Sequence, residues 1–560
     1  MSQACFVRAA LAAALVGALV APTPAHACGG FFCSNATQPV DQSGEQILFS
    51  VDADGSVTAV VQIAYTGPAA SFAWIVPVPA VPELSTGTNT LFDALASATG
   101  VTFATTSTTE GTCHAFPACI PRRSGSSSGG CGMSSSDSVP APAASDAGTR
   151  GVFDAAATGA DSGGGGVTVL AREAVGPYDV VVLEGVDTPA INSWLTANDY
   201  FFPPGAVEAL DPYVAQGSKF VTLRLSKDAI AGDLVPLVMR YTSGEPCIPI
   251  RLTAIATVPN MPITAYFLAD GDVRTDGGYV ETQVPDDVRF WRGMPEAYWE
   301  VLNREVDRAG GHAFVPEYRG PVPSIQLAGE SIEDLRTQTD PKLFLSALAT
   351  RNFVGDTRLL GILSRFLPPP PGDDARTFFN CLISGCGDYD AYLATIPFDP
   401  NALVDALNTA IVEPRASAEA LLHRHTRLTR LTTTMSAAEM TVDPTFRVEA
   451  AGRDISNVRN ATLVSQCSEE YLEWDAPQVL RMPSGTEASW TPGRPYEGDA
   501  EFCGSYGMVP EGSASARGEG SCSCRLAGGA TDGWPAAIGV TLAMLAIGGL
   551  RRRRRRARAR

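Results

Sequence analysis

The stretch EQILFSVDADGSVTAVVQIAYTG (residues 45–67) places two apolar-rich runs on either side of Asp-Ala-Asp-Gly. Runs of this kind around a turn of this composition are typical of a β-hairpin. The segments that follow keep the strand pattern, and a second hairpin is predicted at 261–284. Together they predict a β-rich, mainly antiparallel domain over residues 28–295. The further strand patterns lie at residues 71–84, 167–185, 218–227, 234–243 and 248–259.

Helical patterns dominate after residue 295. Apolar residues recur at helix-like spacing in 294–310 and in 341–367, where a run of four prolines ends the pattern. The stretch 401–440 predicts two further helices broken near Pro414. One short helix is also expected inside the β-rich domain, at 188–199. The sequence therefore predicts an α+β protein with a β-rich N-terminal domain followed by a mainly helical region over 296–470.

Two segments lack any periodic pattern. Residues 121–166 are rich in Gly, Ser and Ala, which is typical of a flexible insertion. Residues 471–533 consist largely of Gly, Ser, Pro and charged residues, and they predict a loosely structured stalk.

Both ends of the chain resemble targeting signals. Residues 1–27 combine a positive start, an apolar run and a small-x-small cleavage site, which predicts a signal peptide read by the export machinery and signal peptidase. Residues 534–550 predict a short transmembrane helix, and the arginine-rich tail 551–560 would hold its end in the cytoplasm. For the first segment the alternatives are a buried helix, a permanent N-terminal anchor and acylation of Cys28. For the C-terminal segment the alternative is a permanent tail anchor.

Charge argues against one class of partner. The formal net charge is −19, and without the nine arginines of the two ends the rest of the chain carries about −28. A body so acidic repels nucleic acid, so a nucleic-acid-binding function is excluded.

Cysteine content indicates disulfides. Without Cys5 and the two C-terminal cysteines, ten remain, an even number that is typical of an exported protein. Three pairs are close in sequence and are expected to bridge locally, and a long-range bridge such as Cys247 to Cys467 is also open. The ten cysteines are Cys28 and Cys33, Cys113 and Cys119, Cys381 and Cys386, and Cys131, Cys247, Cys467 and Cys503.

Three motifs contain residue types that occur in metal or redox sites. CHAFPAC (113–119) holds Cys113, His114 and Cys119, a conceivable zinc set, and CGGFFC (28–33) has the wrong spacing for a redox pair. The loop DGDVRTDGGYVE (270–281) resembles a calcium loop but has arginine and threonine where a ligand and a glycine are needed. It is expected to be an acidic turn.

No familiar catalytic motif is present. The sequence contains no nucleophile elbow, zinc-protease motif, phosphate loop or dinucleotide fingerprint, so no cofactor, metal or catalytic residue is assigned. His423 and His425, in HRHTR, are expected on a solvated basic helix face.

Two resemblances follow from particular residues. ACGGFFC (27–33), FAWIVPVP (72–79), YDVVVLEG (178–185) and HTRLTRLTTTMSAAEMTVDPTF (425–446) resemble the bacterial domain of unknown function number 2330, DUF2330. That resemblance implies architecture and export but no catalytic residue. The C-terminal order of cysteines, apolar run and arginines resembles the myxobacterial sorting signal, MYXO-CTERM, which implies processing by a sorting protease at Cys522 or Cys524 and display at the cell surface.

The expected function is binding or envelope structure by an exported, disulfide-stabilised surface protein with an unknown envelope or extracellular ligand. Two alternatives stay open. One is a surface hydrolase whose site is assembled from distant residues. The other is a biogenesis factor tethered by its C-terminal helix.

Overall fold

The computed structural model of the chain describes the two predicted domains but not the two ends. The predicted signal peptide, residues 122–165 of the predicted insertion, the predicted transmembrane segment 534–550 and the arginine tail lie outside the described residues. Within the described ranges, no helix is both long enough and apolar enough to cross a membrane. These ranges are 41–66, 73–116, 119–121, 166–198, 200, 206–225, 234–242, 245–294, 296–351, 353, 356–492 and 508–510.

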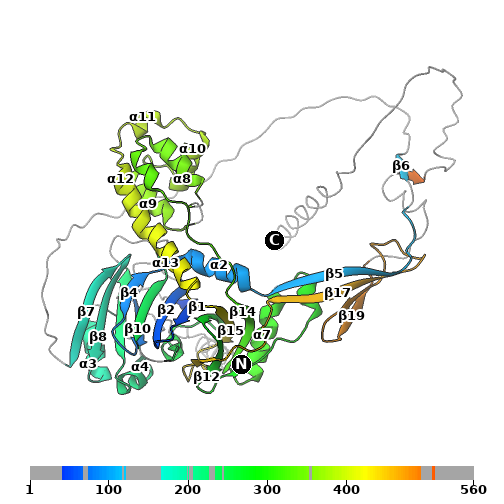
Figure 1. Cartoon of the computed structure of the whole chain (residues 1–560), viewed down its shortest axis with the longest axis horizontal. Helices are drawn as coiled ribbons and strands as arrows, with labels where there is room; N and C mark the ends of the chain where they lie inside the picture. Colours follow the sequence, from blue (N-terminus) through cyan, green and yellow to red (C-terminus); the bar gives the residue numbers. More distant parts are fainter. Residues whose placement is uncertain are drawn as a thin grey trace, which may run out of the picture. The chain divides into compact units, whose positions relative to one another are not determined.

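A large eight-stranded sheet organises the molecule (Figure 1). It begins with the predicted hairpin, whose turn closes at Gly55 with a φ of 82°, a conformation that glycine adopts without strain. Its pairings are antiparallel except β1 with β11 and β13 with β14. In spatial order the strands are β13 (Val280–Glu281), β14 (Ala313–Pro321), β15 (Arg427–Met435), β11 (Met261–Ala269), β1 (Asp41–Val51), β2 (Ser56–Thr66), β10 (Leu237–Thr242) and β4 (Glu83–Thr86).

A second, four-stranded sheet packs against one face of the large sheet. Alternate residues of its strands, such as Val180 and Val221, join Phe49 and Val57 of the large sheet in one buried cluster. Alternation of this kind sends every second side chain to the opposite face. That opposite face is covered by α3 (Thr188–Ala197) and α4 (Ala206–Ala215). The strands, in order, are β3 (Ala73–Val78), β9 (Lys219–Leu225), β8 (Tyr178–Gly185) and β7 (Val167–Val175).

Helices cover the other face of the large sheet. Leu91 and Leu95 of α2 (Asn89–Thr99) and Leu421 of α13 (Glu413–Leu422) pack onto side chains of β1, β2 and β11. Leading into α13 is a small helical cluster with its own apolar core. It contains η3 (Glu333–Thr337), α8 (Pro341–Ala349), α9 (Leu359–Phe366), α10 (Ala375–Ser384), α11 (Asp390–Leu393), α12 (Pro400–Leu407) and the π-helical turn η4 (Asn408–Val412).

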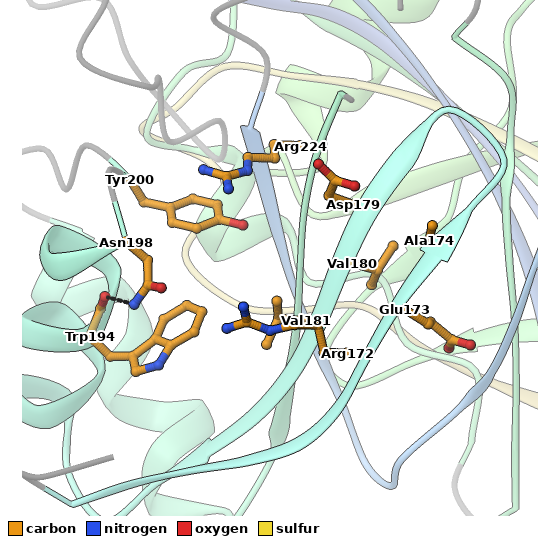
Figure 2. A pocket seen from close by; sticks show the side chains of 10 residues that line it. All are labelled: Arg172, Glu173, Ala174, Asp179, Val180, Val181, Trp194, Asn198, Tyr200 and Arg224. Carbon is orange, nitrogen blue, oxygen red and sulfur yellow. Dashed lines mark hydrogen bonds between the residues drawn. The ribbon is translucent and has the colours of Figure 1, made fainter. Parts of the chain in front are cut away.

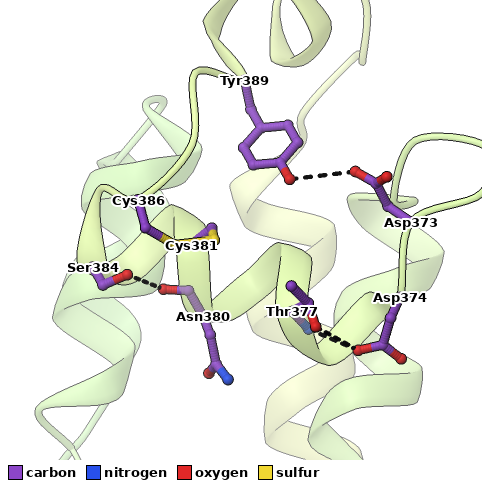
Figure 3. The surroundings of a disulfide bond; sticks show 8 residues. All are labelled: Asp373, Asp374, Thr377, Asn380, Cys381, Ser384, Cys386 and Tyr389. Atoms are coloured by element: carbon purple, nitrogen blue, oxygen red, sulfur yellow. Dashed lines mark hydrogen bonds between the residues drawn. A yellow bond between two sulfur atoms is a disulfide. The ribbon is translucent and has the colours of Figure 1, made fainter. Parts of the chain in front are cut away.

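Helix α10 shows how this cluster is locally defined (Figure 3). The Asp374 side chain accepts a hydrogen bond from the backbone N–H of Thr377 at 2.9 Å and so caps the helix start. At the other end Gly385 takes the left-handed conformation, with a φ of 73°. A disulfide between Cys381 and Cys386 then ties the last turn to the chain that leaves it.

A third sheet extends from the same unit. The strand β5 (Thr102–Gly111) pairs in parallel with β17 (Val458–Cys467), and it is exposed along nearly its whole length. Phe103 of β5 packs against the buried residues of α6 and α7. The remaining elements are α5 (Ile250–Thr253), α6 (Val288–Trp291), α7 (Glu296–Arg308), β18 (Gln478–Arg481) and β19 (Glu487–Trp490), and β12 (Asp272–Asp276) paired with β16 (Thr445–Glu449).

The chain divides into two units, and all the elements above belong to the first. The described part of the second unit is small. Its strand β6 (Cys119–Pro121) pairs antiparallel with β20 (Met508–Pro510). The backbone N–H of His114 donates to the carbonyl of Tyr471 at 2.8 Å, and the Phe116 and Trp474 rings lie 4.3 Å apart.

The predicted α+β class is confirmed, whereas several predicted boundaries are wrong. Strands β14 and β15 lie in the region expected to be mainly helical, yet both belong to the large sheet with β1 and β11, so no domain boundary falls at 295/296. Strands β18 and β19 form inside the predicted stalk, which therefore does not begin at 471. These strands form because they pair with strands that are distant in sequence, and the local residue pattern does not show such pairing.

Individual elements also differ from their predictions. The strand expected at 248–259 contains the short helix α5 instead. The hairpin expected at 261–284 does not form, because β11 pairs with β1 and β15 while β12 pairs with β16. The last helix of the 401–440 stretch ends at Leu422, and the chain then enters β15.

Candidate functional site

Some of the described cysteines form disulfides, and one has a free thiol. Cys381 and Cys386 form the local bridge expected from their spacing, and Cys113 and Cys467 are also disulfide-bonded. Cys247 is free and half-buried, so the bridge from Cys247 to Cys467 is wrong. Cys28, Cys33, Cys131, Cys503, Cys522, Cys524 and the side chain of Cys119 lie outside the described residues.

In the described part of the chain, neither CHAFPAC (113–119) nor the loop 270–281 forms a metal site. Cys113 is disulfide-bonded, which removes its thiolate from a zinc set. In the loop 270–281 the carboxylates face cations: Asp272 pairs with Arg427, and Glu281 with both Arg274 and Arg319. Among the described residues no group of three His, Cys, Asp or Glu side chains is placed to hold a metal ion.

The histidine prediction is wrong for His425. The residue is 7% exposed and lies beyond α13, where its Nε2 is 2.8 Å from the Ser50 hydroxyl and 3.3 Å from Asp52. Its Nδ1 lies 3.7 Å from Asp270. Although these residue types resemble a hydrolase triad, Ser50 is completely buried, so its hydroxyl has no access to a substrate. The cluster connects the end of β1, the segment between α13 and β15, and Asp270, the exposed residue that follows β11.

A hollow of about 400 Å³ opens on the four-stranded sheet, on the face that carries α3 and α4 (Figure 2). Strand pairing produces its floor: Arg172 lies opposite Val181 on the neighbouring strand, and Asp179 lies opposite Arg224. Because Phe220 of the same face is buried under the helices, the strand alternation predicts that Arg224 shares this face. The helices cover the apolar part of the face and leave this polar end open.

The C-terminal end of α3 supplies the wall of the hollow. Trp194 belongs to the last turn of the helix, Asn198 caps it, and Tyr200 follows two residues later. The Asn198 amide donates a hydrogen bond of 2.8 Å to the carbonyl of Trp194, which fixes the amide at the rim. Trp194 and Asn198 are half-buried and Tyr200 is 6% exposed, so the wall is firmly packed into the unit.

Two arginines face this aromatic wall without a carboxylate partner. Neither Arg172 nor Arg224 forms an ion pair with another described residue, although both are exposed and Asp179 lies nearby. The Arg224 guanidinium carbon is 5.9 Å from the centre of the Tyr200 ring, a cation–π distance. Figure 2 shows both guanidinium groups directed toward the side of the hollow that Trp194 and Tyr200 form.

The Tyr200 hydroxyl stays protonated at neutral pH. Burial raises the pKa of this phenol above its usual value, while the hydrogen bond with Thr222 and the charge of Arg224 partly oppose that effect. The hollow therefore offers two cations, neutral hydrogen-bonding groups, two carboxylates (Asp179 and Glu173) and two aromatic rings. Such a set binds an anionic group and a ring-shaped or apolar body side by side.

The family model "Uncharacterized protein conserved in bacteria (DUF2330)" matches residues 22–340, more than half of the chain. The chain belongs to the DUF2330 family. The match contains the whole hollow, both strands of the opening hairpin and η3, but it ends before α8, the other helices of the helical cluster and β15. It is therefore shorter than the 27–447 stretch framed by the resembling motifs. The searches of curated proteins and of solved structures found no match.

No sequence motif marked this site. Its floor residues come from three strands and its wall from the end of a helix, spread over residues 172–224. The stretch VTLRLS (221–226) alternates apolar and polar residues, and Arg224 occupies a polar position of that alternation, so the strand pattern gives no signal for the site.

Proposed function

We propose that this DUF2330 protein is an exported binding protein that captures an anionic saccharide in the hollow on its four-stranded sheet. One observation carries the proposal: Arg172 and Arg224, free of ion pairs with described residues, converge on the ring-lined wall made by Trp194 and Tyr200. A sugar ring lies flat against an aromatic face, and its acidic substituent forms paired hydrogen bonds with a guanidinium.

The charges of the protein support selectivity for such a ligand. The body carries about −28, which repels anions in general. The hollow is lined by two arginines and two carboxylates, and Figure 2 shows the Glu173 carboxylate directed away from the guanidinium groups, so that Asp179 is the acid beside them. Asp179 and Asn198 supply an acceptor and an amide for sugar hydroxyls. The hollow is open on one side, which suits part of a longer chain better than an enclosed small molecule.

Export is proposed on separate grounds. The leader 1–27, the described disulfides and the C-terminal cysteine, apolar and arginine segments support passage through the export machinery, cleavage by signal peptidase and processing by a sorting protease. Mass spectrometry of the mature protein is expected to show an N-terminus at Cys28. External protease on intact cells is expected to cleave the body, and full protection would contradict surface display.

Calorimetric titration of the purified mature protein tests the ligand. An oligogalacturonate of four residues is the probe, and maltotetraose, which is neutral and of similar length, is the control ligand. We expect binding of the acidic tetramer only, weakened at least tenfold by Arg172→Gln and by Arg224→Gln, because each change removes charge-assisted hydrogen bonds. Arg376→Gln, at an exposed arginine of α10, is the matched control and is expected to leave binding unchanged.

The wall has a separate readout. Ligand binding is expected to quench tryptophan fluorescence, because Trp194 lines the hollow. Trp194→Phe is expected to remove this quenching. Equal binding of the neutral tetramer, or acidic binding that neither arginine variant changes, would refute the proposed function.

A further inference from the structure

The strand β5 is the outer strand of the third sheet, and most of its length is exposed to solvent. The sheet has the order β19, β18, β17 and β5, so within the described residues one edge of β5 has no partner strand. Phe103 packs against Phe290 and Tyr298 where the strand begins, whereas all residues from 104 to 111 are exposed. Figure 1 shows β5 and β17 running side by side away from α7.

The other outer strands of the three larger sheets carry features that hinder pairing with a further chain. In the described part of the protein β4, β13 and β19 are only four, two and four residues long. The strand β3 contains Pro77, and β7 has a bulge between Val169 and Ala171. Short length, proline and bulges all protect a strand edge. The strand β5 has ten residues, keeps one register with β17 throughout and contains neither proline nor a basic residue, so its edge lacks this protection.

One hydrogen bond establishes which backbone groups of β5 lie at this edge. The Thr102 N–H donates to the Asn457 carbonyl at 2.9 Å, on the side of β17. The N–H and C=O groups of successive strand residues point alternately to the two sides, and the register with β17 has no shift. The backbone groups of Thr105, Ser107 and Thr109 are therefore directed away from β17, toward the open edge.

We propose that two copies of this protein pair through β5, antiparallel, about a two-fold axis at Ser107. In this register Ser107 lies opposite the partner's Ser107, and Thr105 lies opposite the partner's Thr109. The outward backbone groups of one copy then meet the outward groups of the other, as a hydrogen-bonded antiparallel pair requires. Thr106 lies opposite the partner's Thr108, and threonine pairs of this kind stabilise a sheet across the strands.

Charge supports a second copy as the occupant of this edge. Glu110 is the charged residue of the stretch 104–110; its carboxylate forms an ion pair of 2.8 Å with Arg481, and it would lie opposite the partner's Ala104. No two like charges therefore face each other across the axis. Antiparallel pairing also places the beginnings of the two β5 strands, where α6 and α7 of each copy pack, at opposite ends of the shared edge. The acidic bodies of about −28 each are thereby kept apart.

Analytical ultracentrifugation of the full mature protein tests the pairing. Because the shared edge is short and polar, we expect a weak dimer that forms reversibly as the protein concentration rises. Ser107→Pro removes the N–H that each copy donates at the axis, and proline is tolerated in an edge strand where the missing N–H faces solvent. We expect this variant to weaken dimerisation about tenfold or more. Ser107→Ala keeps the N–H and is the matched control, which should dimerise like the wild type.

Cysteine cross-linking tests the register. Hydrogen-bonded residues opposite each other in an antiparallel pair have Cα atoms about 5.5 Å apart, a separation that a disulfide spans. Ser107→Cys is therefore expected to form a linked dimer on mild oxidation. Thr106→Cys, which would face the partner's Thr108, is the control and is expected to stay unlinked.

Three results would overturn the proposal. They are a monomer at every concentration, a dimer that Ser107→Pro leaves unchanged, and equal cross-linking of the two cysteine variants. The oligogalacturonate titration does not bear on this test, because the hollow is built from β7, β8, β9 and the end of α3.

Discussion

Nε of Arg430 lies 2.8 Å from Oε2 of Glu317 inside the large sheet, and neither side chain is more than a tenth exposed. The pair joins β15 to β14. Tyr298 of α7 and Thr432 each donate a hydrogen bond of 2.7 Å to the same carboxylate. The Arg430 guanidinium also lies over the Tyr266 ring at 5.5 Å. One buried ion pair thus connects two strands, a helix and the aromatic core.

Removing one member of this pair is expected to be costly. Glu317→Ala leaves a buried, unpaired arginine together with two unsatisfied hydroxyl donors, and the expected loss is about 3–5 kcal/mol of unfolding free energy. Urea unfolding measures it. Glu317→Leu combined with Arg430→Met should lose less than the sum of the two single changes, because no charge remains buried. Additive losses would show that the two side chains do not depend on each other.

Glu45 of β1 predicts a pH dependence. Burial raises the pKa of this carboxyl from 4.5 to about 7, and the hydrogen bond from Gln42 opposes the effect. Between these two values the folded protein holds a proton that the unfolded chain has released. The stability contribution is therefore present below pH 4.5 and is lost as the pH rises through about 7, in total about 3 kcal/mol.

Glu45→Gln removes the titrating group and keeps the shape. Urea unfolding at pH 5 and pH 8 is expected to show that the wild type loses more stability with rising pH than the variant does. Glu208→Gln, at an exposed glutamate of α4, is the control and should follow the wild type. Parallel pH profiles for wild type and Glu45→Gln would contradict the assignment.

The residue pattern predicted those elements whose structure depends on residues near in sequence. The hairpin β1–β2 follows from its apolar runs and its Asp-Ala-Asp-Gly turn, and α3 follows from Pro189 in its first turn. The strand β15 was missed because RLTRLTTTM (427–435) continues directly from a helical pattern. Its β-branched residues form a strand because β11 and β14 are available on both sides, and both partners are distant in sequence.

The candidate site could not be predicted for the same reason. Arg172 and Arg224 are 52 positions apart, and only the register of β7, β8 and β9 brings them to one hollow. His425 shows the converse error: its charged neighbours in sequence indicated a solvated face, whereas β1 provides the buried Ser50 and the turn after β1 provides the half-buried Asp52 as partners.

The disulfide of Cys381 and Cys386 is expected to stabilise the helical cluster modestly. The bridge closes a loop of few residues, and the chain-entropy model assigns such a loop roughly 2 kcal/mol. Cys381→Ser combined with Cys386→Ser should increase hydrogen exchange in α10 while the strands of the large sheet stay protected. Loss of protection in β1 and β11 would show instead that the bridge supports the whole unit.

Arg224→Lys separates charge from geometry in the saccharide hollow. Lysine keeps the positive charge but lacks the planar fork that binds a carboxylate through two parallel hydrogen bonds. It also loses the guanidinium that lies 5.9 Å from the Tyr200 ring centre. We expect the affinity for oligogalacturonate to fall about tenfold, equivalent to about 1.4 kcal/mol, and to depend on salt as in the wild type. An unchanged affinity would mean that charge alone attracts the ligand, and the paired contact assigned to Arg224 would then be wrong.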